Sequence, residues 1–214
     1  MENNIAPFKS SSKIEKMIRD ESFVYNRPWF YNHPYALRCE LGVDDSKISY
    51  MKNTKKRAFE IFDLIFASPP DAIFFDHYVE DYSELKENNP NSTLRSLKKE
   101  LKFLSSHLKK YESIIVSDIT CDEVESGNYI QKNRIISYTD KKYPYRKRVV
   151  ENFSWERKTV HFVSFQNECI LSIYDDRGCD IVFATKEKMQ EFYHKLNSYL
   201  LQYDIEEMEK RLAK

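Results

Sequence analysis

Glycine is scarce in this 214-residue chain, which has only three glycines, at positions 42, 127 and 178. Phosphate-binding loops and dinucleotide fingerprints need several glycines close together, because a glycine lets the backbone approach a phosphate group. The three positions are too far apart to form either pattern. The sequence therefore lacks both standard nucleotide-binding motifs.

Cysteine motifs and long apolar runs are also missing. The four cysteines, at positions 39, 121, 169 and 179, form no C-x-x-C pair, so neither a zinc knuckle nor a dithiol redox motif is present. No apolar run approaches the roughly 20 residues of a membrane-spanning helix, and the first residues lack the regions of a secretory signal. We expect a reduced, cytoplasmic protein without a membrane association.

Neither sign of charge dominates, because 34 Lys and Arg residues balance 34 Asp and Glu residues. The chain therefore has no overall field that would attract nucleic acid or an acidic membrane. Its length is sufficient to bury a core without disulfide or metal support, and nothing calls for a cofactor. We expect a single domain over residues 1–214, with a possible joint between lobes near residues 86–93.

The apolar patterns alternate between helical and strand periods and predict an α+β fold with a mixed or antiparallel sheet. Residues 27–35 are rich in aromatic rings and contain two prolines, which predicts a packed, extended connection. Expected helices cover residues 13–19, 54–67, 94–108 (a leucine seam) and 186–201, and expected strands cover residues 36–42, 71–79, 113–119, 133–138, 159–165, 169–174 and 180–184. The last three strands predict a carboxy-terminal antiparallel meander, backed by the final amphipathic helix.

The most distinctive segment is the acidic turn, residues 175–180, where a glycine lies among three carboxylates, a guanidinium and a thiol. Asp175 and Gly178 fit the first and last positions of a type I turn, with Gly178 adopting positive φ as a following bulge. We expect Arg177 to pair with a neighbouring carboxylate. The candidate recognition residues are Asp175, Asp176, Arg177, Gly178, Cys179 and Asp180.

Chemistry at the acidic turn is the first alternative. Its aspartates could offer oxygens to a hard cation, but Arg177 would repel the cation, so a capped turn is favoured and no metal site is assigned. Cys179 could act as a nucleophile with His161 as its base. The aspartates oppose a thiolate, and we expect His161 at the opposite end of the meander from the turn. A small hydrolase or transferase using residues 175–180 stays open, although we assign no catalytic residue.

A basic and aromatic segment over residues 138–148 is the second alternative. Such residue types hold phosphates and stack on bases, and they make this segment the best nucleic-acid candidate in the chain. The neutral total charge and the lack of a recognisable RNA- or DNA-binding motif favour a solvated loop instead. The candidate contacts are Lys141, Lys142, Tyr143, Tyr145, Arg146 and Arg148.

The acidic turn, together with the sequences RCELG at residues 38–42 and KRAFEIF at residues 56–62, resembles a Bacillus-type family known as domain of unknown function 3885. The resemblance covers most of the chain and is strongest in its last third. It implies a fold and an intracellular location, and it implies no activity.

These observations favour a non-catalytic protein that recognises another protein through the acidic turn and its surroundings. An immunity or antitoxin-like role would suit such a protein, because occluding a partner needs a complementary surface and no catalytic groups.

Overall fold

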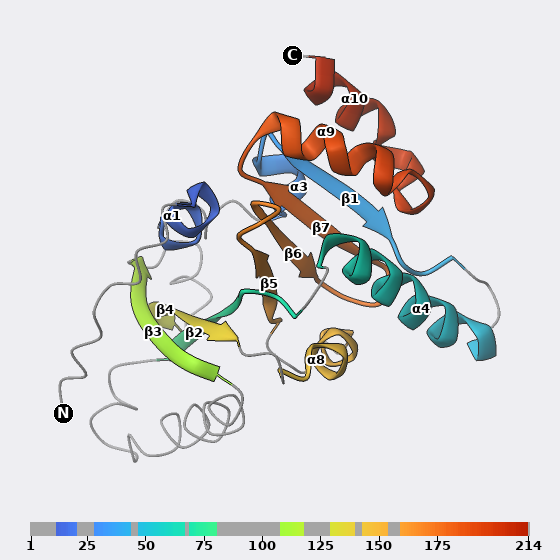
Figure 1. Cartoon of the computed structure of the whole chain (residues 1–214). Helices are drawn as coiled ribbons and strands as arrows, with labels where there is room; N and C mark the ends of the chain where they lie inside the picture. The colour runs from blue at the N-terminus through green and yellow to red at the C-terminus, as the bar shows by residue number, and fades with distance from the viewer. Residues whose placement is uncertain are drawn as a thin grey trace, which may run out of the picture.

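A computed structural model describes residues 12–20, 28–43, 47–66, 69–80, 108–117, 129–139, 143–153 and 159–213. The fold is α+β, as the sequence predicts, with helices packed on a seven-stranded antiparallel sheet (Figure 1). The strand order is β1-β7-β6-β5-β2-β4-β3. Strands far apart in sequence, such as the first and the last, are therefore neighbours.

The strands are β1 (Ala36–Glu40), β2 (Ala72–Glu80), β3 (Leu108–Ser117), β4 (Tyr129–Thr139), β5 (His161–Ser164), β6 (Cys169–Ile173) and β7 (Gly178–Phe183). The helices are α1 (Lys13–Arg19), α3 (Trp29–Asn32), α4 (Lys47–Ile65), α8 (Tyr145–Glu151), α9 (Lys186–Lys195) and α10 (Ile205–Ala213). Two short 3₁₀ turns, Asn197–Tyr199 and Gln202–Asp204, connect the last two helices. None of the helices in the described ranges is both long and apolar enough to cross a membrane.

The predicted meander is present, because β5, β6 and β7 are consecutive antiparallel neighbours. Helix α9 backs it, and Phe192 of α9 stacks on Phe183 of β7 at 5.3 Å between ring centroids. The helix ends at Lys195, with Leu196 as its carboxy-terminal cap, and does not continue to residue 201 as expected. Instead, Leu200 bridges to β1, and the Leu201 amide donates to the Arg38 carbonyl at 2.9 Å, so this segment covers the outer edge of β1.

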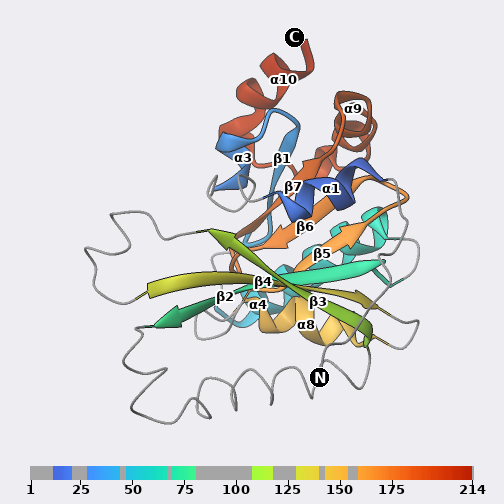
Figure 2. The same cartoon turned by 90° about the vertical axis from the view of Figure 1, so that its left-hand side faces the viewer.

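Helices cover both faces of the sheet (Figures 1 and 2). On one face, α4 packs its Phe62 ring against Phe162 of β5 and stacks it on Tyr145 of α8. The other face is covered by α1 and α3. Because side chains alternate along a strand, each strand contributes every second residue to this second face.

A buried ion pair attaches α1 to the second face. Arg134 of β4 donates to the Asp76 carboxylate of β2 at 2.9 and 3.3 Å, and its third nitrogen donates to the Ile18 carbonyl of α1 at 3.0 Å. Both side chains are almost fully buried. The pair crosses from strand to strand and fixes the end of α1 above the sheet.

The prediction of an extended connection over residues 27–35 was wrong at its centre, where α3 forms one helical turn. Pro28 occupies the amino-terminal cap and Pro34 follows the carboxy-terminal cap, and proline does not interrupt a helix at either position. The lobe joint near residues 86–93 and the leucine seam up to residue 107 lie outside the described residues, and Leu108 begins β3.

Candidate functional site

The acidic turn is closed by its own side chains. The Asp175 carboxylate accepts the Arg177 backbone N–H at 2.8 Å and the Arg177 guanidinium at 2.9 and 2.6 Å. The predicted capped turn and its Arg–carboxylate pair are therefore both present. The Arg177 carbonyl accepts the amides of Leu41 and Gly42 at 2.8 and 3.3 Å, which attaches the turn to the segment after β1.

Most of the candidate recognition residues are buried. Asp175, Gly178, Cys179 and Asp180 are inaccessible, Asp176 is half-buried, and Arg177 is exposed. Only Asp176 and Arg177 can therefore present their side chains directly to a partner.

Gly178 serves a different purpose from the one expected. The prediction of positive φ was wrong, and the residue begins β7 with ordinary backbone geometry. A Cβ atom at this position would lie 2.3 Å from the Tyr174 hydroxyl and 2.8 Å from the Cys39 carbonyl. Glycine is needed here because of the close approach of Tyr174 and β1.

Four polar side chains form a row across adjacent strands on the face covered by α3. Arg38 of β1 pairs with Asp180 of β7, and Asp180 pairs with Ser172 of β6. The register of β5 against β6 places His161 beside Ser172. We call Arg38, Asp180, Ser172 and His161 the polar row.

The position of His161 corrects a sequence prediction. We expected it at the opposite end of the meander from the acidic turn, and it lies near the turn. The reason is that β5 and β6 are antiparallel, so the start of β5 is next to the end of β6, where the turn begins. Its ring contacts Trp29 of α3 at 4.5 Å and Phe74 of β2 at 4.8 Å between centroids.

Arg38 and Asp180 form the strongest interaction of the polar row. The guanidinium donates to both carboxylate oxygens at 2.8 and 3.1 Å, and the Phe30 amide donates to the same carboxylate at 3.2 Å. The rings of Phe30, Tyr31 and Tyr174 surround the guanidinium at 5.0, 4.7 and 5.7 Å. Burial alone would lower the pKa of Arg38, but the hydrogen bonds and charge of Asp180 outweigh it and raise the pKa.

A second carboxylate approaches Arg38 from the carboxy-terminal segment. One Asp204 oxygen lies 3.7 Å from Arg38 Nη1, and the other accepts the Tyr31 hydroxyl at 3.3 Å. Burial raises the pKa of Asp204, although Arg38 acts in the opposite direction. The Arg38 charge is therefore shared between two carboxylates.

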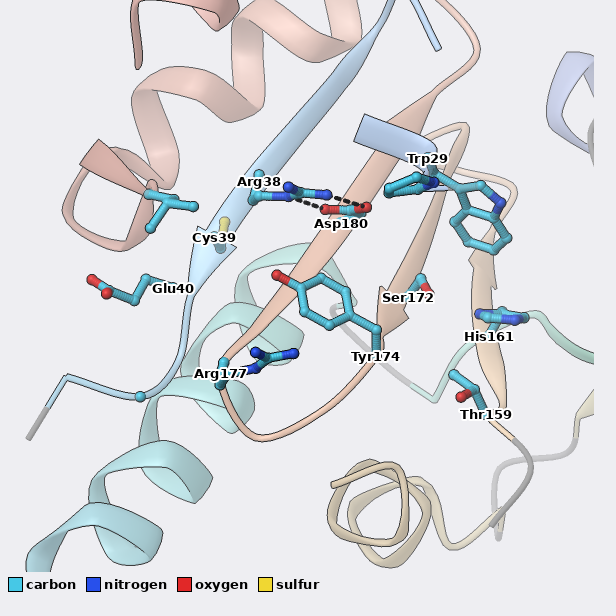
Figure 3. A pocket seen from close by; sticks show the side chains of 13 residues that line it. Trp29, Arg38, Cys39, Glu40, Thr159, His161, Ser172, Tyr174, Arg177 and Asp180 are labelled. Atoms are coloured by element: carbon cyan, nitrogen blue, oxygen red, sulfur yellow. Dashed lines mark hydrogen bonds and ion pairs between the residues drawn. The ribbon is translucent and has the colours of Figure 1, made fainter. Parts of the chain in front are cut away.

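The polar row forms part of the lining of a cavity of about 760 Å³ (Figure 3). In Figure 3, Arg38 points toward Asp180, the Tyr174 ring lies between Arg177 and Ser172, and Trp29 lies beside His161. The lining residues come from α3, β1, β5, β6, β7, the acidic turn and segments beside these elements: Pro28, Trp29, Arg38, Cys39, Glu40, Gly42, Thr159, His161, Ser172, Tyr174, Arg177, Asp180 and Leu201. The cavity thus joins two residues of the acidic turn to groups that sequence reasoning had not connected with it.

Arg38, Ser172 and Trp29 are site residues that sequence reasoning missed. One signal was available, since Ser172 and Asp180 interrupt strands that are otherwise apolar on both faces. A polar residue inside a strand that is buried on both faces needs a partner or a purpose. The sequence alone does not show which distant strands bring these residues together.

Cys179 is poorly suited to act as a nucleophile. It lies opposite Cys39 in the β1–β7 pair, and both thiols are buried and free. The hydrogen bond with Cys39, followed by burial, raises the pKa of Cys179 well above its usual value. Among the described residues, no three His, Cys, Asp or Glu side chains are grouped so as to hold a metal ion.

The basic and aromatic segment is engaged in packing where it is described. Tyr143 and Arg148 are buried, and Arg148 pairs with Glu151 at 2.8 Å. Arg146 is exposed but pairs with Asp63 at 2.8 Å. The segment contains helix α8 where a solvated loop was expected, and Lys141 and Lys142 lie outside the described residues.

Comparison with known proteins identifies the family of this chain and indicates no activity. A family model described as a domain of unknown function (DUF3885) matches residues 14–204. No curated protein and no solved structure matches the chain. The match agrees with the resemblance seen in the sequence, whose Bacillus-type origin stays a prediction.

Proposed function

We propose that this chain, which belongs to the family described as a domain of unknown function, DUF3885, binds a small polar molecule in the cavity above β5, β6 and β7. The observation that carries the proposal is the polar row. It brings four polar side chains from four strands to one cavity, on a sheet whose remaining interior is mainly apolar.

Burying polar groups lowers stability unless each of them is hydrogen-bonded. A sequence selected for stability alone would fill these positions with apolar side chains, so a polar cavity is a common sign of a binding site. The volume of about 760 Å³ lies within the range of small-molecule sites, roughly 300–1,000 Å³.

Ser172 gives the proposal its sharpest test. It is only 6% exposed, it lines the cavity, and the structure records no hydrogen bond for its hydroxyl within the described part of the chain. Ser137 is a matched control, because it is also a buried serine whose hydroxyl has no partner among the described residues, yet it does not line the cavity.

The experiment is a thermal-shift screen of small polar metabolites against the wild type, Ser172→Val and Ser137→Val. A ligand at 100 times its Kd stabilises the folded state by about 2.7 kcal/mol, which raises Tm by several degrees. We expect compounds that raise Tm for the wild type and Ser137→Val and raise it less for Ser172→Val. A complete lack of such compounds, or an equal response of all three proteins, would contradict the proposal.

A second candidate function is recognition of another protein, including an immunity or antitoxin-like role. The observation that favours it is a set of exposed aromatic and basic side chains near the cavity. Tyr31 and Tyr203 are 51% and 87% exposed, and the Arg177 side chain is 68% exposed. Tyrosine and arginine are enriched among the residues that dominate protein–protein binding.

A pull-down with the intact protein tests this second candidate. We expect one stoichiometric protein partner that binds the wild type and binds Asp176→Lys more weakly, with no loss of folding. Recovery of no partner, or equal binding by the variant, would contradict it. For an immunity role, the partner should be a toxin encoded by an adjacent gene.

A further inference from the structure

The charged groups within the cavity are already paired with one another. The Asp180 carboxylate accepts two hydrogen bonds from the Arg38 guanidinium, at 2.8 and 3.1 Å. The Asp175 carboxylate accepts two from the Arg177 guanidinium, at 2.9 and 2.6 Å. Hydrogen bonds between ionised partners are about twice as strong as neutral ones. Each guanidinium that lines the cavity therefore has its own carboxylate.

The neighbouring charges are matched in the same way. The Glu40 carboxylate lies on the far side of β1 from Tyr174 (Figure 3), and Arg57 lies beside Glu40, donating to its carbonyl at 3.0 Å. Asp204 is near a second arginine, Arg211, as well as the arginine of the polar row. Each of these carboxylates thus has an arginine beside it.

This pairing disfavours a charged ligand of either sign. An anion would have to displace a buried carboxylate from its guanidinium, and a cation would have to displace a guanidinium from its carboxylate. Breaking such a pair leaves a buried charge without compensation, which is strongly unfavourable. A charged ligand would also lose its own hydration on entering the cavity. The cavity is therefore suited to a ligand without net charge.

The buried hydroxyl of Ser172 indicates that the ligand forms hydrogen bonds. Ser172 is only 6% exposed and lines the cavity, and no hydrogen bond is recorded for its hydroxyl within the described part of the chain. The sheet register places it between Asp180 and His161. A serine hydroxyl can both donate and accept, so a ligand group of either kind can satisfy it.

Asp180 offers a second hydrogen-bonding position beside Ser172. Its Oδ1 atom accepts one recorded hydrogen bond, from Arg38 Nε, and a carboxylate oxygen can accept two. A ligand with hydroxyl groups on neighbouring atoms can donate to Asp180 through one hydroxyl and bond to Ser172 through the next. It does so without bringing a charge into the cavity. Sugars and cyclitols have hydroxyl groups in this arrangement.

Tyr174 offers an aromatic surface to the same ligand. It lies two residues after Ser172 along the chain, its ring lies between Arg177 and Ser172 (Figure 3), and it is 37% exposed. The Trp29 ring, which also lines the cavity, is only 2% exposed. The face of an aromatic ring carries partial negative charge, so it attracts the weakly positive C–H groups on the face of a sugar ring.

From these observations we infer that the ligand is a small uncharged molecule with neighbouring hydroxyl groups, as in a monosaccharide or a cyclitol. Its hydroxyls bond to Asp180 and Ser172, and its C–H face contacts Tyr174. This inference rests on the proposed small-molecule function and adds the chemical class of the ligand.

The test is isothermal titration calorimetry with probes that separate charge from hydroxyl content. Glucose and myo-inositol are uncharged and rich in hydroxyls, protonated glucosamine and glucuronate are the charged counterparts of glucose, and uracil is uncharged without hydroxyls. The proteins are the wild type, Ser172→Val, Tyr174→Leu and the control Ser137→Val. Circular dichroism checks that each variant is folded, and the amide chemical shifts of Ser172 and Tyr174 report whether a probe occupies the cavity.

We expect glucose or myo-inositol to bind and to shift both amides. The charged counterparts should bind about tenfold or more weakly, because each must disrupt a buried ion pair. Ser172→Val and Tyr174→Leu should each weaken the binding about two- to tenfold, the effect of one hydrogen bond or one ring contact. Ser137→Val should leave it within about twofold, since Ser137 lies outside the cavity.

Several results would overturn the inference while the proposed function survives. Tighter binding of glucosamine or glucuronate than of glucose would show that the site prefers a charge. Binding of uracil alone would show that hydroxyl groups are not recognised, and an equal effect of Ser172→Val and Ser137→Val would show that Ser172 does not contact the ligand.

If none of these probes binds, the inference fails by itself. The proposed function is then decided by the thermal-shift screen, and it fails as well only if no compound of any class binds there.

Discussion

The Tyr174 ring lies across Gly178, with its hydroxyl where a Cβ atom on Gly178 would be only 2.3 Å away. Residue 178 lies within the acidic turn and pairs with Glu40, so the missing side chain lets Tyr174 lie over β7 beside the cavity. This relationship links a residue that is conspicuous in the sequence to the shape of the candidate site.

The first prediction concerns this contact. Gly178→Ala should lower the free energy of unfolding by about 1–3 kcal/mol, because the added methyl group overlaps Tyr174 and the Cys39 carbonyl. Urea unfolding measures the loss. In a Tyr174→Phe background the loss should be smaller, since the hydroxyl overlap is gone and only the closer approach to the Cys39 carbonyl, at 2.8 Å, and to the ring carbon Cζ, at 3.0 Å, remains. An equal loss in both backgrounds would contradict this explanation.

The second prediction concerns the buried pair of Arg134 and Asp76. Arg134→Met should lower the free energy of unfolding by about 3–5 kcal/mol, because it leaves the Asp76 carboxylate buried without its partner. Arg146→Met is the control, since the exposed Arg146–Asp63 pair should contribute at most about 1 kcal/mol. Chemical denaturation of both variants checks the difference, and similar values would show that burial does not set the cost.

The third prediction concerns Glu168, in the turn between β5 and β6, where φ is 45°. This left-handed conformation is unfavourable for most side chains and readily adopted by glycine. Glu168→Gly should therefore leave stability unchanged or raise it by up to about 1 kcal/mol. Gln190→Gly, within α9, should instead lower it by about 1 kcal/mol, and thermal unfolding should separate the two variants.

The fourth prediction concerns pH. Burial, followed by the nearby charge of Arg211, lowers the pKa of His33 to about 4. In the unfolded chain the pKa is about 6.5, so between these values the unfolded state binds more protons than the folded state. Stability should consequently fall as pH decreases from about 6.5 toward 4.

Unfolding measured across this pH range for the wild type and His33→Gln isolates the contribution of His33, because the carboxylates are common to both proteins. As pH falls from about 6.5 toward 4, the free energy of unfolding of the wild type should decrease more than that of His33→Gln. A constant difference would show that His33 titrates normally in the folded state.

The fifth prediction concerns the thiols. Cys39, Cys169 and Cys179 are buried, and burial raises the pKa of Cys169 while the hydrogen bond with Cys39 and burial raise that of Cys179. Each should react with a thiol reagent far more slowly in the native state than after denaturation, as followed by site-resolved mass spectrometry. Rapid native labelling of Cys179 would restore the case for a thiol nucleophile.

Much of the fold could be predicted from local sequence, because period and capping are local properties. Ser12 caps the amino-terminal end of α1 and Thr185 that of α9, each with its side chain accepting a backbone N–H, as their sequence positions suggest. The three strands of the meander, β5, β6 and β7, were also predicted from their short apolar runs. Helix α9 ended early because Leu200 pairs with β1, a distant contact that outweighs the helical spacing of the leucines.

The site was harder to predict because it depends on pairing between distant strands. Residues 38 and 180 are brought together by the β1–β7 register, and no local pattern specifies that register. The acidic turn is conspicuous in the sequence because of its charges. In the structure, two of its three carboxylates are paired with arginines, Asp175 with Arg177 and Asp180 with Arg38. The less conspicuous Ser172 lines the cavity, and its hydroxyl has no hydrogen bond among the described residues.

The segment that covers β1 has a consequence for shortened forms of the protein. The Leu201 amide donates a hydrogen bond to the Arg38 carbonyl, and Asp204, three residues later, lies beside the Arg38 guanidinium. A chain truncated before Leu200 would expose β1 as an edge strand, and a strand from another copy could pair with it. The truncation would also remove Asp204, one of the two carboxylates beside Arg38. Aggregation and a changed ligand preference should therefore appear together in the truncated protein.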